Sequence, residues 1–545
     1  MSKFLETSRK IAGDFLQTAV FIDDKLDGEK HKTAVPPAGA ANNPPGYNAF
    51  EPKKEQQLPE GQPADANYSR DDVSVNSKGD ETKESDDSVN AQSIVSSFME
   101  KGIICSVIKY DERFSEKELF EKQREDYIKL CIKLIEKADI AVLDWDLYKD
   151  GGETILKIIN STAKKDNSLN ELRLIVIYTY QDLDKVKDEI LKLNLDFKEI
   201  DTYILHNKYT TISMFSKPGK SVTGGRECSP SELADKCIEE FTAAFRGVVP
   251  NVVLATVSEI RKNTHRLLGV LNKDLDIGYL SHRALLPFPE DAENHLEDII
   301  ADEIGSIISG NETGKNSSYE KICDYSEISD KVYKCIDDFA ICFPLLIAAG
   351  AENILCDAQK EILKEQHKNC FTKEWYGSED ESKNSEKLFA VVSSMQTDYS
   401  KNMRKFLKLG LIIQRVDNNV RYLCIQPECD SVRLHKNEKT EFMFLKLKSK
   451  QFGENFDLIF DDGSRYEVNY GRHNRKTIFF KTSENEIVES KNNDEFIDES
   501  NNKYKYICSL KKSHAQKIAN EFGAYISRVG LNESEYIRRN RSKGR

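Results

Sequence analysis

Short apolar segments alternate with segments of helical periodicity over the first 250 residues. The apolar runs predict five strands, at 20–24, 103–108, 140–143, 174–178 and 211–216. Apolar positions three and four apart predict helices between them, at 2–17, 91–101, 116–137, 152–159, 184–193 and 229–246. The last helix opens with Ser-Pro-Ser-Glu, a sequence that caps helix N-termini. Strands that alternate with helices predict an α/β domain with a parallel sheet and crossover helices.

One segment interrupts this pattern directly after the first strand. Residues 25–90 show almost no periodicity and contain seven of the chain's 14 prolines, amid Gly, Asn, Ser and acidic residues. Such a composition buries too little apolar surface to offset the entropy lost on ordering, so we predict a disordered insertion. A tether, a partner-binding segment, a shield over the neighbouring strand end and a tolerated surface insertion all remain open.

The periodicity changes again after residue 248. Residues 249–369 have mainly helical spacing, residues 386–409 predict two more helices, and short β segments begin at 411. We therefore predict three domains: an α/β domain at 1–248, a helical domain at 249–384 and an α+β domain at 385–545.

Residues 385–425 allow a second interpretation of the C-terminal part. Helix, turn, helix and a hairpin across 417–419 is the order of elements in a winged helix, and residues 401–450 contain more Lys and Arg than Asp and Glu. This order predicts DNA binding as an alternative function. The short second helix and the long β segment favour simple packing of helices on a sheet instead.

Composition narrows the compartment and the class of partner. The 545 residues carry a formal net charge of -13, which argues against a protein coated in nucleic acid but leaves room for a local basic patch. No apolar run approaches the ~20 residues of a membrane span, and residues 1–20 alternate charged with apolar residues, unlike a signal peptide. Twelve scattered cysteines are typical of reduced thiols, so we expect a cytoplasmic protein without membrane attachment.

Polar side chains follow four of the five predicted strands. Asp23 and Asp24 end the first strand, Asp144 follows the third, Thr179 follows the fourth and Lys217 follows the fifth. Because the carboxyl ends of parallel strands meet at one edge of a sheet, we expect these side chains to converge. Carboxylate oxygens are ligands that Mg²⁺ prefers, while a hydroxyl and an ammonium group suit the oxygens of a phosphoryl group.

In this order, these residues resemble the receiver domain of two-component response regulators, over about residues 1–247. The segment 143–147 with Asp150-Gly151-Gly152 is similar to the loop that carries the phosphoacceptor. The resemblance implies a flavodoxin/CheY-like, doubly wound parallel sheet of five strands. It implies a histidine kinase as phosphodonor and Asp144 as phosphoacceptor. It implies a Mg²⁺ ion held by Asp23, Asp24, Asp144 and the main-chain carbonyl of Asp146. It also implies that Thr179 binds a phosphoryl oxygen and that Lys217 neutralises phosphoryl charge.

Three positions bear on signal lifetime and output. Asp146 and Gln181 lie two residues beyond the nucleophile and the threonine, where receivers line the path of the hydrolytic water, so we expect steady self-dephosphorylation. Met214 stands three residues before Lys217, where many receivers carry a switch aromatic, and Phe215 should face the other side of the strand. These departures favour a phosphate-accepting buffer without a strong output switch.

Two C-terminal segments resemble a narrower group. Residues 422–433 and 527–538 are similar to the large response receivers of bacterial antiphage conflict operons of the Detocs type. That resemblance implies a histidine kinase partner and leaves open a second receiver or effector protein and a homodimer. No catalytic signature follows Gly247. We predict a cytoplasmic phosphorelay regulator or phosphate buffer in antiphage defence; the alternatives are a DNA-binding regulator and an effector with an unrecognised C-terminal activity.

Overall fold

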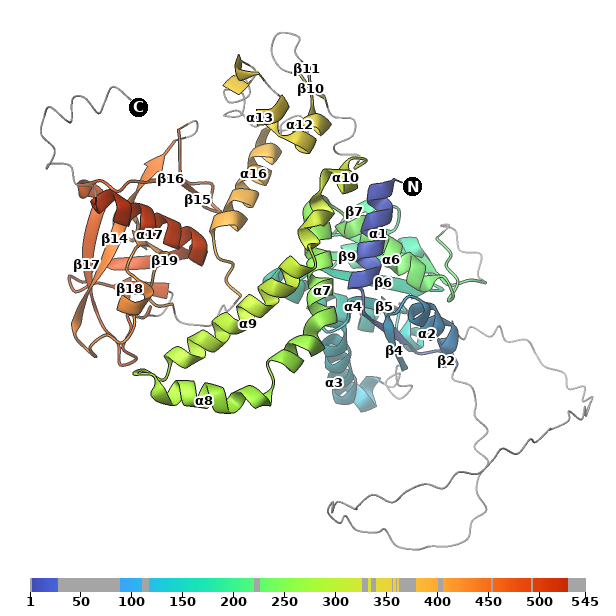
Figure 1. Cartoon of the computed structure of the whole chain (residues 1–545). Coiled ribbons are helices and arrows are strands. Elements are labelled where there is room, and N and C mark those ends of the chain that lie inside the picture. The colour runs from blue at the N-terminus through green and yellow to red at the C-terminus, as the bar shows by residue number, and fades with distance from the viewer. Residues whose placement is uncertain are drawn as a thin grey trace, which may run out of the picture. The chain divides into compact units, whose positions relative to one another are not determined.

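The computed structural model of the chain describes residues 2–27, 89–109, 117–219, 226–325, 332–334, 340–354, 356–358, 360–361, 379–399, 405–451, 454–491 and 494–527. The chain divides into two compact units, Met1–Tyr325 and Ser326–Arg545. The first unit contains an α/β sheet with its helices, and the second contains an antiparallel sheet (Figure 1). The division into three domains at 248 and 384 stays a prediction.

A seven-stranded sheet forms the centre of the first unit, in the order β4-β1-β5-β6-β9-β8-β7. Its strands are β1 (Thr18–Asp23), β4 (Ile104–Lys109), β5 (Ile140–Leu143), β6 (Arg173–Thr179), β7 (Lys198–Asp201), β8 (Ile204–His206) and β9 (Thr210–Ser216). The five strands from β4 to β9 in this order pair in parallel, which confirms the predicted α/β fold.

The strand count of five is wrong, because an antiparallel hairpin extends the sheet beyond β9. β8 pairs with β9, and β7 pairs with β8. Periodicity does not predict the hairpin, because all four side chains of β7 are exposed and β8 has only three residues. β7 shows no buried alternation, and the alternation in β8 is too short to mark a strand in sequence.

Helices cover both faces of the sheet. On one face lie α1 (Lys3–Phe15), α2 (Ala91–Glu100) and α6 (Leu233–Phe245); on the other lie α3 (Lys117–Ile135), α4 (Glu153–Leu169) and α5 (Leu183–Leu191). Alternate residues of β1 enter the two cores, with Ala19 and Phe21 on the first face and Val20 and Ile22 on the second. Burial of both faces is why these strands appear in the sequence as continuous apolar runs.

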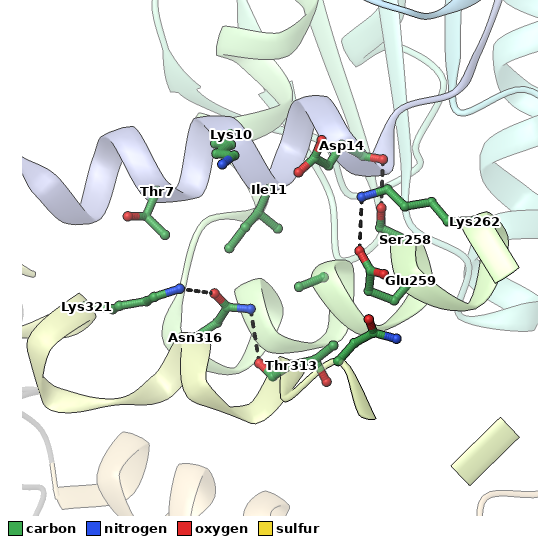
Figure 2. A pocket seen from close by; sticks show the side chains of 12 residues that line it. Thr7, Lys10, Ile11, Asp14, Ser258, Glu259, Lys262, Thr313, Asn316 and Lys321 are labelled. Carbon is green, nitrogen blue, oxygen red and sulfur yellow. Dashed lines mark hydrogen bonds and ion pairs between the residues drawn. The ribbon is translucent and has the colours of Figure 1, made fainter. Parts of the chain in front are cut away.

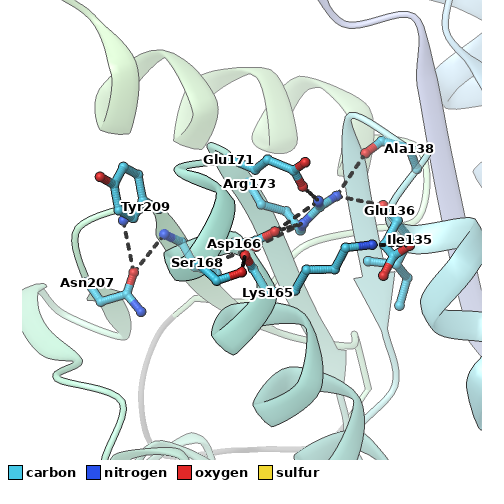
Figure 3. Close-up of polar contacts among 11 residues, drawn as sticks. Ile135, Glu136, Ala138, Lys165, Asp166, Ser168, Glu171, Arg173, Asn207 and Tyr209 are labelled. Carbon is cyan, nitrogen blue, oxygen red and sulfur yellow. Dashed lines mark hydrogen bonds and ion pairs between the residues drawn. The ribbon is translucent and has the colours of Figure 1, made fainter. Parts of the chain in front are cut away.

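A buried ion pair joins four elements at the amino end of the sheet (Figure 3). Arg173, the first residue of β6, donates from Nε and Nη2 to the Asp166 carboxylate of α4 at 3.0–3.1 Å, and from Nη1 to the Ile135 carbonyl at 2.7 Å. Thr210 Oγ1, at the start of β9, donates to Asp166 Oδ2 at 3.2 Å. Both charged side chains are buried, so each depends on the other for solvation.

The predicted disordered insertion at 25–90 lies mostly outside the described residues. Its described ends are β2 (Leu26–Asp27) and β3 (Val89–Asn90), which pair in parallel. The chain therefore leaves the fold at β2, which begins three residues after the end of β1, and re-enters it at the neighbouring β3.

α7 (Val248–Val270) packs along α1. Ser258 Oγ donates to the Asp14 carbonyl at 2.8 Å, and Asn251 Nδ2 donates to Ser8 Oγ at 2.9 Å. Figure 2 shows the seam between these helices and η4 (Thr313–Ser317), which encloses a polar cavity of about 400 Å³. These contacts attach the helices after residue 248 to the α/β layers.

The helical character predicted for 249–369 is confirmed as far as Ile322. After α7 come η3 (Lys273–Leu275), α8 (Asp276–Leu285), α9 (Asp291–Gly310) and α10 (Tyr319–Ile322). The second unit then begins with a two-stranded antiparallel pair, β10 (Val332–Lys334) and β11 (Ala340–Cys342), which departs from the prediction. Short helices α12 (Phe343–Ala349) and α13 (Ala351–Ile354) follow.

An eight-stranded antiparallel sheet dominates the second unit, in the order β15-β16-β14-β13-β12-β19-β18, with β17 paired to β14. Its strands are β12 (Leu411–Arg415), β13 (Arg421–Cys424), β14 (Lys439–Lys450), β15 (Leu458–Ile459), β16 (Arg465–Val468), β17 (Arg475–Lys481), β18 (Glu495–Ile497) and β19 (Lys503–Ser509). The helices α16 (Glu379–Ser394) and α17 (Lys512–Ile526) contribute to its core, as expected for an α+β unit.

The predicted helix-turn-helix is wrong. α16 is a single helix, and the described residues at 395–399 and 405–410 form no second one. The β12–β13 hairpin exists, but it lies inside the eight-stranded sheet rather than beside a helical core as a wing. Leu407 and Leu409, which lie in the segment predicted to be the second helix, instead pack into the cores of that sheet.

Two further predictions concern membrane spans and the C-terminal segment 527–538. Among the described residues, no helix is both long enough and apolar enough to cross a membrane. Of the C-terminal segment 527–538, only Ser527 is described.

Candidate functional site

The polar strand ends converge at the carboxyl edge of the sheet, as predicted. Parallel register sets Ile22 beside Leu143, and the Asp144 amide donates to the Ile22 carbonyl at 2.9 Å. On the neighbouring pair, the Lys217 amide donates to the Thr179 carbonyl at 2.9 Å. The backbone ladder thus continues one residue past each strand and fixes the starting point of each functional side chain.

Three buried carboxylates form the centre of the site. Asp23, Asp24 and Asp144 are 0%, 2% and 6% exposed, and one carboxylate oxygen from each lies within 4.8 Å of the other two. Asp23 Oδ1 also accepts a hydrogen bond from the Lys25 amide at 2.8 Å. Buried like charges repel strongly, so an arrangement of this kind is maintained only with a compensating cation nearby.

Lys217 supplies one positive charge to this cluster. Its Nζ lies 2.6 Å from Asp23 Oδ2 and 3.0 Å from Asp144 Oδ2, and the side chain is 1% exposed. Burial alone lowers the pKa of the Lys217 ammonium, but attraction by Asp144 and Asp23 outweighs burial, and the pKa is raised. Lys217 therefore stays protonated at neutral pH and leaves the four groups with a net negative charge.

Asp144 is a buried carboxylate whose pKa departs from its ordinary value. Burial raises its pKa from 3.8 to about 6, although the Lys217 ammonium opposes that shift; the Asp23 charge adds to it. Within the described part of the chain, Asp144 Oδ1 accepts no hydrogen bond. A buried oxygen of this kind is open to a metal ion, a phosphorus atom or a proton.

Thr179 lies beside these charges at the end of β6. Its side chain is 1% exposed, and Oγ1 accepts a hydrogen bond from the Gln181 amide at 3.2 Å. The hydroxyl also helps to lower the pKa of Asp144, so it lies within polar range of that carboxylate. The Thr179 hydroxyl can donate a hydrogen bond to an anionic oxygen that binds beside Asp144.

Asp146 and Gln181 contact each other across the mouth of the site. Gln181 Nε2 donates to Asp146 Oδ2 at 2.9 Å, and Asp146 Oδ1 accepts from the Gly151 amide at 2.9 Å. The contact links the loop after β5 to the loop after β6, and both partners are accessible to water. The use of the Asp146 main-chain carbonyl as a metal ligand stays a prediction.

Sequence reasoning missed the residues that shape the loop after Asp144. Arg124 of α3, 6% exposed, donates to Thr154 Oγ1 at 2.9 Å and lies 3.7 Å from Asp150. Asp150 in turn accepts from the amides of Gly152 and Thr154, both at 2.9 Å. An arginine in an amphipathic helix gives no local signal that it will reach a loop 26 residues later in the chain.

Gly152 closes this loop by permitting a close approach. Its φ is +89°, and a Cβ built on it would lie 2.3 Å from Cε2 of Trp145. Trp145, directly after Asp144, is 4% exposed and packs in the core below the site. Any larger residue at 152 would displace the indole and with it the backbone next to Asp144.

Met214 and Phe215, three and two residues before Lys217, face opposite sides of the sheet, as predicted. Met214 packs in the core beneath α3, α4 and α5, while Phe215 packs in the core on the opposite face. Tyr178, directly before Thr179, is buried, and its hydroxyl donates to the Cys228 carbonyl at 2.9 Å. Its ring centroid lies 5.7 Å from Lys217 Nζ.

The donor set fits a hard divalent cation. All three side chains offer oxygen, and octahedral Mg²⁺ with ligands at ~2.0–2.1 Å keeps its ligand oxygens within ~4.2 Å of one another. The observed limit of 4.8 Å needs only a small inward movement, and Asp144 Oδ1 is free to make it. Two net negative charges remain after Lys217 is counted, which a divalent cation neutralises.

Comparison with known proteins agrees with this geometry. The family model described as the response receiver domain matches residues 15–221, a range that contains every residue of the site above. No curated protein and no solved structure gave a significant match. The matched range begins within α1 and ends just after β9, so it contains the whole parallel sheet and its hairpin. Residues 15–221 of this chain are therefore a response receiver domain.

Proposed function

We propose that the chain is a phosphorelay protein in which Asp144 accepts a phosphoryl group from a partner histidine kinase with the help of Mg²⁺. The observation that carries this proposal is the buried triad of Asp23, Asp24 and Asp144 with Lys217, at the carboxyl edge of a receiver-domain sheet. A general role in response regulation follows from the receiver domain. The nucleophile, the metal and the donor are the proposed parts.

Asp23, Asp24 and Asp144 would hold the metal ion, with the main-chain carbonyl of Asp146 as a further oxygen ligand. Bound Mg²⁺ neutralises charge that develops on the phosphoryl oxygens. The protein's own task is to hold three carboxylates together before the ion binds. The Lys217 ammonium does this, because its contacts to Asp23 and Asp144 offset part of their mutual repulsion.

The transfer is a displacement at phosphorus. One oxygen of the Asp144 carboxylate attacks the phosphorus of an N-phosphorylated imidazole, and an O–P bond forms while the P–N bond breaks. The electron pair of the broken bond goes to the imidazole nitrogen, which takes up a proton. The product on this chain is an acyl phosphate. No general base is needed, because the attacking carboxylate is already ionised above its pKa of about 6.

Two side chains would hold the transferred group. The Lys217 ammonium can contact a phosphoryl oxygen without leaving its place at the end of β9, and the Thr179 hydroxyl can donate to another. In the usual receiver switch, movement of the threonine draws a buried aromatic side chain inward. Met214 occupies that place here, so the proposal is a phosphate buffer or a regulator read at another surface.

The contact between Gln181 and Asp146 would set the lifetime of the acyl phosphate. Both side chains stand at the accessible side of the site and already share a hydrogen bond of 2.9 Å. A water molecule that attacks the phosphorus would have to approach beside this pair. Their amide and carboxylate groups can orient that water, which favours self-dephosphorylation.

Replacing Lys217 by alanine is the direct test of this arrangement. We expect Lys217→Ala to retain Mg²⁺ binding, because the three carboxylates remain, but to lower the rate of phosphotransfer by about 100-fold, as for loss of one preorganised charge on a transition-state oxygen. The measurement is the rate of acyl-phosphate formation from a small phosphoramidate donor, with Mg²⁺ affinity from calorimetry. Lys192→Ala, which removes an exposed lysine directly after the end of α5, is the matched control and should transfer at the wild-type rate. A Lys217→Ala rate equal to wild type would remove Lys217 from the site.

The raised pKa of Asp144 predicts a pH dependence of metal binding. A divalent ion binds the ionised carboxylate, so protons compete with it below a pKa of about 6. Affinity for Mg²⁺ should fall by up to about tenfold per pH unit below pH 6 and should level off above about pH 7. Calorimetric titrations from pH 5 to 8 measure this, and Asp144→Asn should flatten the curve. An affinity that keeps rising between pH 7 and 8 would show that another group controls binding.

The wider setting is proposed on the resemblance alone. Residues 422–433 and 527–538 suggested an antiphage two-component system with a histidine kinase and a second receiver or effector as partners. An effector activity in the second unit also stays open. Its test is turnover of nucleotides or nucleic acid by the purified chain, with and without phosphorylation of Asp144.

A further inference from the structure

A polar cavity lies between α1, α7 and η4, away from the site described above (Figure 2). Its volume of about 400 Å³ falls in the range of ~300–1,000 Å³ that is usual for small-molecule sites. The residues that line it belong to the segments 7–14, 255–262 and 311–321. None of these lining residues lies within 15–221, so the receiver family does not account for the cavity.

Hydrogen bonds between the walls hold this cavity in shape. Ser258 Oγ of α7 donates to a carbonyl of α1 at 2.8 Å, and Thr256 Oγ1 of the same helix donates to Thr313 Oγ1 of η4 at 2.9 Å. Just after α10, the Asp324 carboxylate accepts from the Phe4 amide at the start of α1, also at 2.9 Å. The cavity is therefore formed before a ligand binds, as most small-molecule sites are.

The two long helices of the wall run in the same direction, which gives the cavity two different ends. Asn251 of α7 lies beside Ser8 of α1, and seven residues later Ser258 lies beside Asp14. One end is formed by the second turn of α1 together with α10, which contacts the start of α1. The other end is formed by the last turn of α1 and residues 258–262 of α7.

Charges of opposite sign lie at these two ends. Lys10 and Lys321 lie at the end next to α10, whereas Asp14 and Glu259 lie at the other end (Figure 2). The four residues from Lys10 to Asp14 separate the two ends by about 6 Å along α1. Glu259 Oε1 pairs with Lys262 Nζ at 3.0 Å, so the second end has two carboxylates and one ammonium group, a net charge of -1.

The charged groups at both ends are available to a ligand. Within the described part of the chain, the Lys10 ammonium and the Asp14 carboxylate form no hydrogen bond or ion pair, so neither has to break a protein contact to bind. Lys321 Nζ donates to Asn316 Oδ1 at 2.8 Å and has two more hydrogens to donate. A complementary molecule therefore has an anionic group at one end and hydrogen-bond donors at the other.

The charge balance narrows the chemistry of that molecule. Over the whole cavity, three lysines face two acidic residues, a surplus of one positive charge that favours a net anionic ligand over a zwitterion. A molecule with anions at both ends would meet repulsion from Asp14 and Glu259. A phosphate group with neutral hydroxyl groups at the far end meets both conditions. Lysine binds phosphate as a point charge, and carboxylates accept from ribose hydroxyls in nucleotide sites.

We propose that the cavity between α1, α7 and η4 binds a small phosphorylated sugar, either free or as the ribose phosphate of a nucleotide. The phosphate contacts Lys10 and Lys321, and the sugar hydroxyls donate to Asp14 and Glu259. The cavity shares no residue with the cluster around Asp144. Binding there does not depend on the transfer chemistry proposed above.

Calorimetric titration of the full chain with ribose-5-phosphate and with adenosine monophosphate tests the proposal. The buffer contains EDTA, so that the Asp144 site has no metal ion to hold a phosphate. We expect at least one of the two compounds to bind with a dissociation constant below about 1 mM. Equal affinities identify the sugar phosphate as the whole ligand, and tighter binding of adenosine monophosphate identifies a nucleotide. Inorganic phosphate, which cannot reach the acidic end, should bind at least about tenfold more weakly.

Substitutions at each end give matched comparisons. Lys10→Ala combined with Lys321→Ala should weaken binding about 100-fold, as for the loss of two charge-assisted hydrogen bonds. Asp14→Asn should weaken binding of the sugar phosphate about tenfold without weakening that of inorganic phosphate. Lys3→Ala combined with Lys315→Ala removes the same charge from α1 and η4 outside the cavity, and this control should bind as the wild-type chain does.

Three results would overturn the proposal. The first is the absence of binding by both compounds at about 1 mM. The second is binding that survives the combined substitution of Lys10 and Lys321. The third is binding of ribose-5-phosphate and adenosine monophosphate that is no tighter than that of inorganic phosphate, because the acidic end would then contribute nothing.

Discussion

Replacing Asp144 by asparagine is expected to abolish acyl-phosphate formation and to leave the receiver domain folded. The amide has no charged oxygen to attack phosphorus, whereas its size and shape match those of the carboxylate. We further expect the metal-free variant to be more stable than wild type at pH 8. The folded-state pKa of Asp144 is about 6 against 3.8 for the free group, so stability falls as pH rises from about 4 to 6, and the full cost persists above that range.

The size of that gain follows from the pKa difference. Two pKa units correspond to up to about 3 kcal/mol of unfolding free energy, which asparagine should recover, because the pKa of about 6 already includes the attraction of Asp144 to Lys217. Acid-labile phosphate measured after incubation with a phosphoramidate donor, together with urea unfolding at pH 8, tests both parts. Asp146→Asn is the matched control, since it changes the next aspartate along the loop, and it should still accept phosphate. Acid-labile phosphate persisting in Asp144→Asn would mean that another residue is the acceptor.

Replacing Arg173 by methionine should cost the receiver domain about 3–5 kcal/mol of unfolding free energy. The substitution keeps most of the side-chain volume but leaves the Asp166 carboxylate, with a side chain that is 1% exposed, without its charged partner. It also removes the hydrogen bond that joins β6 to the Ile135 carbonyl at the end of α3. Because this ion pair lies at the end of the sheet opposite the functional site, its effect should appear in stability and not in Mg²⁺ affinity.

Urea unfolding followed by fluorescence reports on this loss, because Trp145 is buried in the receiver core. The double variant Arg173→Met with Asp166→Leu removes both charges and should recover most of the stability, since the cost comes mainly from the unpaired carboxylate. A loss below about 1 kcal/mol in the single variant, or a double variant as unstable as the single one, would show that the pair contributes little.

The parallel strands and the site could be predicted because their signal is local. A strand buried on both faces must be apolar throughout, so Ile140–Leu143 was predicted with the bounds that the structure has. The polar residue after such a run marks the strand end, and sheet topology brings those ends together. For that reason Asp23, Asp24, Asp144, Thr179 and Lys217 could be grouped before any coordinates were known; their individual roles stay predictions.

The features that the sequence did not predict depend on contacts between distant residues or on segments with weak secondary-structure preference. The hairpin of β7 and β8 has exposed or very short strands, so no periodicity marks it. Arg124 acts on a loop in another part of the chain. The helix predicted from 229 begins at Leu233, because Ser229 Oγ bonds the Glu232 carboxylate at 2.7 Å and forms a turn before the helix. The second helix of the winged-helix interpretation failed because apolar spacing alone does not separate a helix from an irregular segment that enters two cores.

The central claim, that Asp144 is a phosphoacceptor in a working Mg²⁺ site, is tested most directly with beryllofluoride. This anion stands in for the phosphoryl group and bonds to the acceptor carboxylate when Mg²⁺ is present. Native mass spectrometry of the titrated full chain should show one beryllofluoride and one Mg²⁺ bound per chain, retained in Asp146→Asn and lost in Asp144→Asn. Failure of the wild-type chain to take up beryllofluoride, or equal uptake by Asp144→Asn, would contradict the account.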